Sequence, residues 1–163
     1  MAKTGTTKGL TQSVRKKPKP LTVGKAKERA WKAFSTYIKL RDALKTTGTL
    51  THCKCITCGK VFPIEYQADG AYIQSGHAID GRGKNILFDE DLTNGQSSTC
   101  NCVHNGRLPE YAAIMIRKFG QDWWDEKVRI ARLPAEKPWK VCDLLEIEEK
   151  YKAKVKELLK GTL

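Results

Sequence analysis

Apolar residues recur at helical spacing between about residue 25 and residue 44. Within KAKERAWKAFSTYIKLRDAL, Ala30, Phe34 and Ile38 follow one another at intervals of four, and Leu40 or Arg41 comes next on that side. This period is typical of an amphipathic helix whose apolar stripe packs on a core. The positions between are rich in lysine and arginine. The segment therefore predicts a helix with a basic outer face, which TTGTLTH ends.

The C-terminal third predicts three further helices. EYAAIMIRKFG is expected to end at Gly120, QDWWDEKVRIARL follows it, and KVCDLLEIEEKYKAKVKELLK closes the chain. The last segment carries one apolar stripe, made of Val141, Leu144, Leu145, Tyr151, Val155, Leu158 and Leu159. We expect this stripe to pack on the protein's own core, and the alternative is a coiled-coil contact with a second copy.

Between Cys53 and about Asn105 the pattern changes to short strands and turns. CITCGKVF predicts a tight turn around Gly59, AYIQSGHAI has strand composition, and Ile86–Phe88 predicts a second short strand. A helix is expected to begin near residues 94–100. The predicted order is β-loop-β-helix, in an α+β protein with helices before and after this core.

The first 23 residues show no apolar periodicity. They are rich in lysine, threonine and proline, so we expect a flexible basic arm that orders only on a partner. Of the net charge of +12, residues 1–46 hold +11, because they contain 13 Lys/Arg and two acidic residues. Such a localised field predicts a polyanionic partner, most commonly nucleic acid. The alternative is a solubilising tail.

No apolar run reaches the roughly 18 residues that cross a bilayer. The N-terminus also lacks the apolar region of a secretory signal. A cytoplasmic protein with no membrane partner is therefore expected.

Five of the six cysteines are clustered. Cys53, Cys55 and Cys58 lie in HCKCITCG, and Cys100 and Cys102 lie in TCNCVH. Disulfides are rare in a reducing cytosol, so metal ligation is favoured. Cys55, Cys58, Cys100 and Cys102 would supply four thiolates to a structural Zn²⁺. Because C-x-C reaches one metal less comfortably, Cys53 or His52 is the alternative to Cys102. The remaining alternative is a set of buried thiols without a metal.

Groups suited to phosphodiester cleavage lie between the two cysteine clusters. His77 lies in SGHAID, Arg82 and Lys84 follow it, and the acidic run FDED comes next. Cleavage needs a base, a divalent cation and a group that holds the phosphate. His77, oxygen ligands drawn from Asn101, Glu90 and their neighbours, and Arg82 could fill these roles. Composition alone supports two interpretations about equally. One is this catalytic site, and the other is a structural histidine beside a solvated acidic turn.

An ordered set of motifs resembles one known family. The motifs are CITCG, SGHAIDGR, ILFDED, Gln96, Cys100-Asn101 and NGRLPEY, flanked by AWKAFSTYIKLRD and WKVCDLLEIEEKYKAKVKELL. Together they resemble the NinG (Rap) family of lambdoid-phage recombination nucleases, which belongs to the ββα-metal, or His-Asn-His (HNH), endonucleases. The resemblance begins at about Lys25. It implies a zinc-stapled ββα-metal core flanked by N- and C-terminal helices.

The resemblance also implies the catalytic residues. His77, on the first strand of the core, would be the general base. In the related phage resolvase endonuclease VII, an asparagine directly after the last zinc cysteine ligates the catalytic Mg²⁺, and Asn101 matches that position. Gly76 stands where endonuclease VII has an acidic ligand, so Glu90 or Asp80 must supply the second metal ligand, and Glu90 is preferred.

The chain departs from the family pattern at two further places. Ser97 stands where the family's second cysteine pair begins. Leu92 matches a family asparagine, and Asn94 is the nearby polar residue, so Asn94 is added to the predicted catalytic set.

The resulting prediction is a DNA endonuclease of phage recombination that uses Mg²⁺ or Mn²⁺ for catalysis and Zn²⁺ for structure. A preference for branched DNA, such as Holliday junctions or D-loops, comes from the resemblance alone. A homodimer is expected because a symmetric junction needs two cuts. The alternatives are a non-catalytic zinc protein that binds nucleic acid and a non-selective HNH nuclease that cuts linear duplex.

Four regions follow from these patterns: the flexible basic arm 1–23, the basic amphipathic helix 24–46, the zinc-knuckle core 47–106 and the helical region 107–163. The predicted DNA contacts are Arg15, Lys16, Lys17, Lys19, Lys25, Lys27, Arg29, Arg41 and Arg82. Contacts of this kind bind the phosphates of DNA and do not recognise its base sequence.

Overall fold

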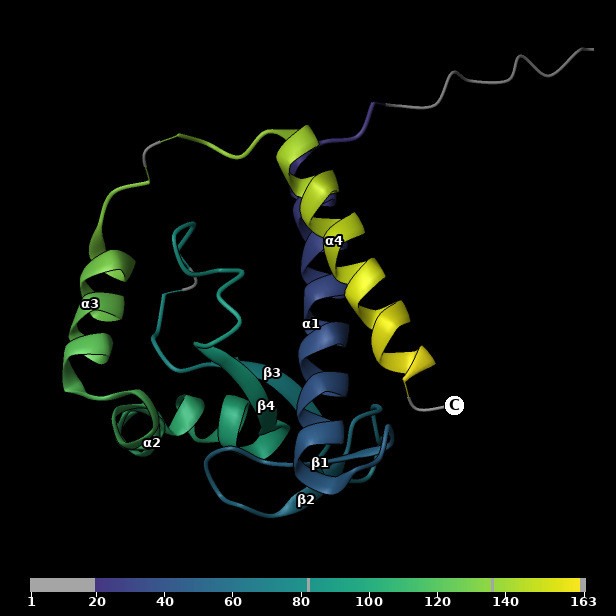
Figure 1. The fold of residues 1–163 in the computed structure, drawn as a ribbon, viewed down its shortest axis with the longest axis vertical. Coiled ribbons are helices and arrows are strands. Elements are labelled where there is room, and N and C mark those ends of the chain that lie inside the picture. The colour runs from purple at the N-terminus through teal and green to yellow at the C-terminus, as the bar shows by residue number, and fades with distance from the viewer. Residues whose placement is uncertain (1–19, 82, 136, 162–163) are drawn as a thin grey trace, which may run out of the picture.

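The computed structural model describes residues 20–81, 83–135 and 137–161, which form an α+β fold (Figure 1). The helices are α1 (Val23–Thr47), α2 (Leu108–Phe119), α3 (Gln121–Arg132) and α4 (Val141–Lys160). The strands are β1 (His52–Lys54), β2 (Val61–Pro63), β3 (Ile73–His77) and β4 (Thr93–Ser97). Two short turns, the π-helical η1 (Thr99–Val103) and the 3-10 turn η2 (Asn105–Arg107), join β4 to α2.

Helix α1 confirms the first predicted helix and is slightly longer than expected. It begins where the Thr22 hydroxyl accepts a hydrogen bond from the Lys25 N–H, at 3.4 Å. It ends at Gly48, which has a left-handed backbone (φ 69°) and whose N–H donates to the Leu44 carbonyl. Glycine suits this position because a side chain there would be strained.

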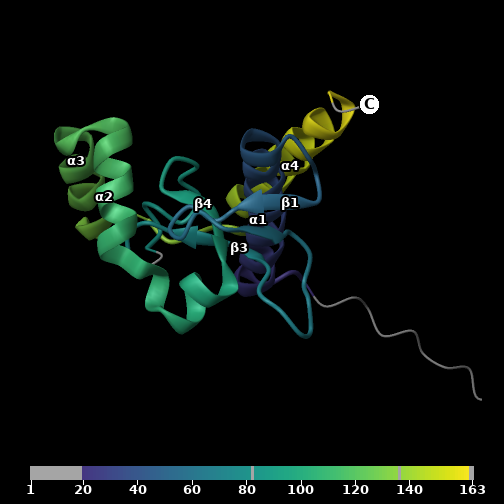
Figure 2. The same cartoon turned by 90° about the horizontal axis from the view of Figure 1, so that it is seen from below.

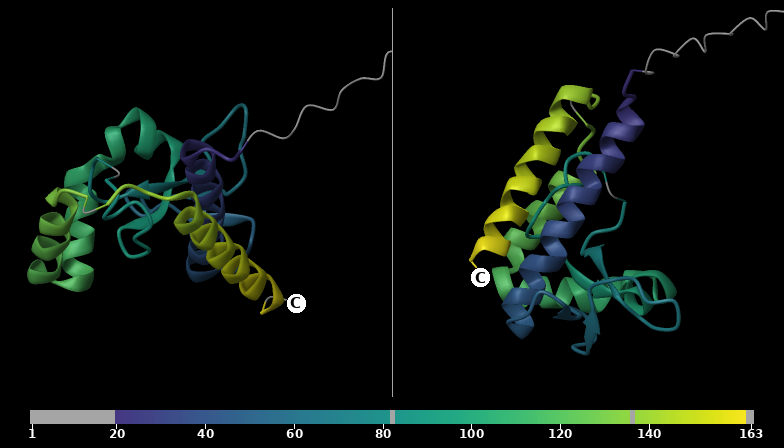
Figure 3. Two further views of the ribbon diagram at one scale, coloured as in Figure 1. Left: turned by 90° about the horizontal axis from the view of Figure 1, so that it is seen from above. Right: turned by 90° about the vertical axis from the view of Figure 1, so that its right-hand side faces the viewer.

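Helices α1 and α4 lie side by side and run in the same direction (Figures 1 and 3). Ala26 and Ala30 pack with Leu144 near the start of both helices, and Phe34 packs with Tyr151 further along. The rings of Phe34 and Tyr151 meet edge to face, with centroids 4.8 Å apart, which is a favourable aromatic geometry. The stripe on α4 therefore packs on the protein's own core, as predicted.

In the part of the chain that the structure describes, the β structure consists of two separate antiparallel hairpins. Strand β1 pairs with β2, and β3 pairs with β4 in a register that places His77 opposite Thr93. The strand predicted at Ile86–Phe88 is wrong, because this run forms a turn in which the N–H groups of Ile86 and Leu87 both donate to the Gly83 carbonyl. The second strand of the core is β4, and the helical turn η1 follows it near the expected position.

Helices α2 and α3 cover the other side of the β3–β4 hairpin from α1 and α4 (Figures 1 and 2). They meet at Gly120 (φ 94°), the predicted end of the first of them. Two contacts fix α3 to the segment between β3 and β4. Lys127 pairs with Asp89 at 2.5 Å, and the Asn85 amide donates to the carbonyls of Ile130 and Leu133.

Within the described ranges, no helix is both long enough and apolar enough to cross a membrane.

Candidate functional site

Three of the predicted zinc ligands converge. The sulfur atoms of Cys55, Cys58 and Cys100 all lie within 4.8 Å of one another, and Cys55 and Cys100 are buried. Four thiolates around a zinc ion at about 2.3 Å require sulfur–sulfur separations of roughly 3.8 Å. The cluster fits three corners of such a tetrahedron.

Local backbone structure creates this cluster. The turn after β1 is closed by a hydrogen bond from the Gly59 N–H to the Cys55 carbonyl, and Gly59 has the left-handed backbone (φ 72°) that the turn needs. This places Cys55 and Cys58 on one turn. Cys100 comes from η1, where its N–H donates to the Ser97 hydroxyl at 3.2 Å.

The surroundings of Cys55 favour its thiolate. Burial opposes ionisation, but hydrogen bonds from the backbone N–H groups of Cys58 and Ser97 and from the Thr57 hydroxyl outweigh it, so that the pKa of Cys55 falls to about 6. A thiolate is the form of cysteine that binds metals. Burial, and after it the neighbouring Cys55 thiolate, raise the pKa of Cys58.

None of the three candidates for the fourth zinc ligand joins the cluster. Cys102 is exposed, and its sulfur donates to the Gln74 side chain at 3.2 Å. Cys53 is buried beside α1, where burial raises its pKa to about 11. His52 lies at the surface beside Thr51.

Ser97, like Thr57, is a polar residue that contacts the cluster. It is 1% exposed, its N–H donates to the Cys55 sulfur at 3.2 Å, and its hydroxyl accepts from Cys100. Ser97 is the position that the sequence analysis identified as the start of the family's second cysteine pair.

His77 lies at the end of β3 with 8% of its surface exposed. Its Nε2 is 3.1 Å from the Leu87 carbonyl oxygen. A carbonyl can only accept, so Nε2 carries the proton, and in the neutral ring Nδ1 carries the basic lone pair. The ring also stacks on Trp31 of α1, with centroids 5.3 Å apart and planes inclined by 19°. Two contacts thus fix the ring and its tautomer.

A cavity of about 350 Å³ joins His77 to Asn101. Its lining residues are His77, Ile79, Asp80, Gly81, Asn101, Asn105, Gly106 and Leu108. The Asn101 amide nitrogen donates to Gln74 at 2.7 Å, which orients the side chain, and Asp80 accepts from the Gly81 N–H. The cavity therefore combines a histidine imidazole with a carboxylate and an amide oxygen, and these two oxygen groups are ligand types that Mg²⁺ prefers.

Glu90, the preferred second metal ligand, lies elsewhere. Its carboxylate accepts from the Lys154 ammonium at 2.5 Å and from the Tyr151 hydroxyl at 3.1 Å. Burial opposes its ionisation, but these two partners prevail and lower the pKa of Glu90. Glu90 thus connects α4 to the segment before β4. The carboxylate that lines the cavity is that of Asp80, which was the alternative metal ligand predicted from the sequence.

Asn94 also has a structural setting. It is buried in β4, and its amide donates to the Tyr111 hydroxyl at 3.0 Å and to the Asp91 carbonyl. Tyr111 in turn donates to the Gly76 carbonyl at 3.1 Å. This network ties both strands of the hairpin to α2, and Asn94 is not among the residues that line the cavity.

The predicted DNA contacts divide into three groups. Lys25 and Lys27 are exposed, as a DNA contact requires, and Arg29 pairs with Glu148 at 2.9 Å. Arg41 instead donates to the carbonyls of Glu90 and Thr93 and to the Asp42 carboxylate, so its guanidinium holds the fold together. Arg15, Lys16, Lys17, Lys19 and Arg82 lie outside the described residues.

Sequence reasoning missed two residues that position the site. Trp31 stacks on His77, and Gln74 holds Asn101. Gln74 lies on β3 three residues before His77, and its polarity in a buried strand was the available signal. No sequence pattern connects Trp31 to His77, because the contact spans two elements.

Comparison with known proteins agrees with the motifs. A family model described as the bacteriophage lambda NinG protein matches residues 6–161. No curated protein and no solved structure matches the chain significantly. Because the family model covers nearly the whole sequence, the chain belongs to the NinG family.

Proposed function

We propose that this protein is a metal-dependent DNA endonuclease whose ββα-metal core consists of β3, β4 and η1. The main observation that supports the proposal is that His77, Asp80 and Asn101 line the same cavity. It contains a base with a fixed tautomer beside oxygen ligands, the set that phosphodiester hydrolysis requires.

In this mechanism His77 Nδ1 removes a proton from water, and the resulting hydroxide attacks phosphorus as the bond to the leaving oxygen breaks. The Leu87 carbonyl keeps the proton on Nε2, so that Nδ1 is the ring nitrogen that can accept a proton. Asp80 and Asn101 would hold the Mg²⁺ or Mn²⁺ ion. Such an ion neutralises charge on the phosphate and on the leaving oxygen.

The cysteine cluster would hold Zn²⁺ in a structural role. Cys55 and Cys58 come from the β1–β2 hairpin, and Cys100 comes from η1, directly before Asn101. A metal that joins these segments contributes its binding free energy to folding. It would also fix Asn101 relative to His77.

The proposed substrate is branched DNA formed during phage recombination. Membership in the NinG family supports this choice, and the local basic charge supports a nucleic-acid partner. We propose a homodimer, because resolving a symmetric junction takes two cuts. Sedimentation with and without junction DNA tests this: a single monomer mass in both conditions contradicts the dimer.

Comparing a labelled four-way junction with a linear duplex of the same sequence, in Mg²⁺ and in Mn²⁺, tests the substrate. Faster cleavage of the junction supports the proposal. Equal cleavage of both substrates indicates the non-selective nuclease. Binding of both without cleavage in either metal indicates the non-catalytic zinc protein.

A further inference from the structure

The cavity that contains His77 continues on both sides. A cavity of about 590 Å³ shares Asn105 and Leu108 with it, and another of about 370 Å³ shares Ile79, Asp80 and Leu108. Leu108, the first residue of α2, lines all three. The three cavities therefore adjoin one another, with the candidate catalytic residues in the middle one, and we call this row of cavities the central groove.

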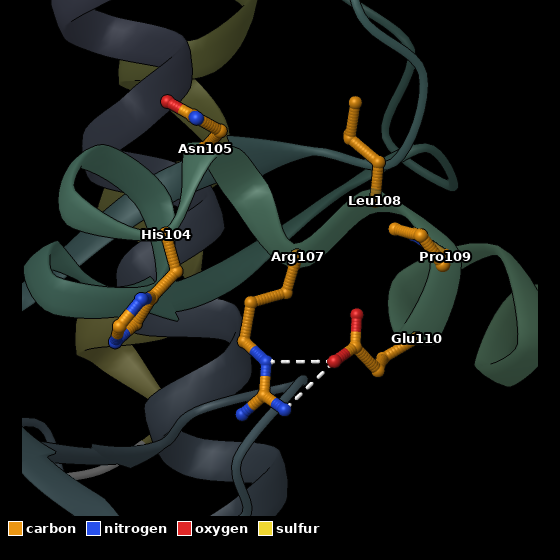
Figure 4. Close-up of a pocket in the computed structure, with 6 residues that line it drawn as sticks. All are labelled: His104, Asn105, Arg107, Leu108, Pro109 and Glu110. Carbon is orange, nitrogen blue, oxygen red and sulfur yellow. Dashed lines mark hydrogen bonds and ion pairs between the residues drawn. The ribbon is translucent and has the colours of Figure 1, made fainter.

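Arg107 lies at one end of the central groove. Figure 4 shows its side chain extending to the same side as that of His104, with its guanidinium beside Glu110. Both Nε and Nη2 of Arg107 donate to one oxygen of Glu110, at 3.1 and 2.8 Å. This end is partly exposed, so the ion pair is weak and can exchange its partner for a phosphate.

Arg132 lies at the other end. It is the last residue of α3, it is exposed, and it lines its cavity together with Trp124 and Val128. No acidic group in the described ranges pairs with it. An exposed arginine beside an aromatic ring is the combination that holds a phosphate and the base next to it.

Arg132 is fixed relative to His77. The Asn85 amide donates to the carbonyl of Leu133 at 2.9 Å and to that of Ile130 at 3.1 Å, on both sides of Arg132 in the chain. Asn85 is two residues from Leu87, whose carbonyl orients His77. The end of α3 and the base are thus attached to one short segment.

We propose that a single DNA strand lies along the central groove. Its scissile phosphate contacts His77, and the phosphates on either side are bound by Arg107 and Arg132. The inference rests on the proposed function and refines its substrate. Each cavity has the size of a small-molecule site, which admits a nucleotide of one strand and not a duplex. The strand must therefore leave its complement, which costs least at a branch point or an unpaired patch.

Binding measured without cleavage tests this strand path. The affinity of the full-length protein, with its zinc retained, for a labelled four-way junction is measured by fluorescence anisotropy at several salt concentrations, in buffer without Mg²⁺ or Mn²⁺. Arg132→Ala is compared with Arg129→Ala, which changes the same charge on the same helix. Arg129 pairs with Glu126 and does not line the central groove.

We expect Arg132→Ala to weaken binding roughly 5- to 10-fold and to reduce the slope of log K against log salt by about 1. Arg107→Ala should do the same, and Arg129→Ala should change neither quantity appreciably. If Arg132→Ala and Arg129→Ala behave alike, Arg132 does not bind the strand and the proposed path is wrong.

A second comparison tests the single strand itself. The native protein should bind a duplex with a short unpaired patch more tightly than the fully paired duplex, and equal affinity would overturn the proposal. Neither result depends on cleavage. If the protein binds as expected but cuts nothing, the strand path stands and the nuclease function is wrong. If it cuts DNA but Arg132→Ala has no effect on binding, the nuclease function stands and the strand path is wrong.

Discussion

Asp80 and Glu90 are both carboxylates near His77 in the sequence, and their surroundings separate their roles. Asp80 lines the cavity, and Glu90 is held by Lys154 and Tyr151 of α4. A carboxylate already bound to an ammonium group is a poor metal ligand, because the metal must displace that partner. Spacing along the chain could not separate them, since only folding brings α4 beside Glu90.

Asp80→Asn should reduce the cleavage rate about 100-fold or more, as removal of an essential charge-stabilising group does, and should leave the melting temperature unchanged. Glu90→Gln should keep the cleavage rate and lower the free energy of unfolding by about 1 kcal/mol. Cleavage rates and thermal melts of both variants check this. A folded Glu90→Gln protein that cannot cut would contradict the assignment.

The Glu90 contribution should depend on pH. Because the pKa of Glu90 is lowered in the folded protein, its stabilisation is complete above the pKa of an unfolded glutamate and is lost as pH falls through the folded value. The difference in unfolding free energy between native and Glu90→Gln protein should therefore shrink in acid. Urea denaturation at a series of pH values measures it, and a constant difference would show that Lys154 does not pair with the charge.

Ser97 is the residue from which the zinc site can be completed. Ser97→Cys should add a fourth thiolate and lower the zinc dissociation constant at least about tenfold, which is ~1.4 kcal/mol. Competition with a chelator measures the constant, and the absorption spectrum of the Co²⁺ form reports the number of sulfur ligands. Thr99→Cys, which adds a thiol at an exposed neighbouring position, is the control. Equal affinities for the two variants would exclude Ser97 from the site.

At the scale of elements, helices were predicted well and the second strand was not. The apolar stripe of α1 and the glycine after α2 are local signals, and local signals determine helices. Ile86–Phe88 is apolar and short, which suits a strand or a buried turn equally. The true strand β4, Thr93–Ser97, is almost entirely polar, because its side chains form hydrogen bonds inside the fold.

Asn94 shows what such a polar strand residue does. Asn94→Ala should lower the free energy of unfolding by about 1–3 kcal/mol, because it leaves the buried Tyr111 hydroxyl without a donor. Cleavage well below the melting temperature should persist. Tyr111→Phe is the matched variant, and the effects of the two changes should not add, since they share one hydrogen bond. Additive effects would contradict the network.

At the scale of the whole molecule, family membership and the cysteine cluster were both predictable from ordered motifs. The contacts between helix pairs were not, because Trp31 reaches His77 and Lys154 reaches Glu90 across long stretches of chain. The N-terminal helix α1 thus contacts a residue of the candidate site through Trp31, which the division into regions did not suggest.

Zinc removal should act on the whole fold. Dialysis against a strong chelator should lower the melting temperature, because Cys55, Cys58 and Cys100 join segments far apart in the chain. Added Zn²⁺ should restore it, and added Mg²⁺ should not. An unchanged melting curve after verified loss of zinc would contradict a structural site.

The central claim is that His77 is the base of a metal-dependent nuclease. Its most direct test is the cleavage of a labelled four-way junction by native protein and by a folded His77→Ala variant, in Mg²⁺, in Mn²⁺ and without either added metal. The account predicts products from the native protein only with a divalent metal, and a loss of about 100-fold or more in the variant. Equal cleavage by the variant, or no cleavage by the native protein in either metal, would contradict it.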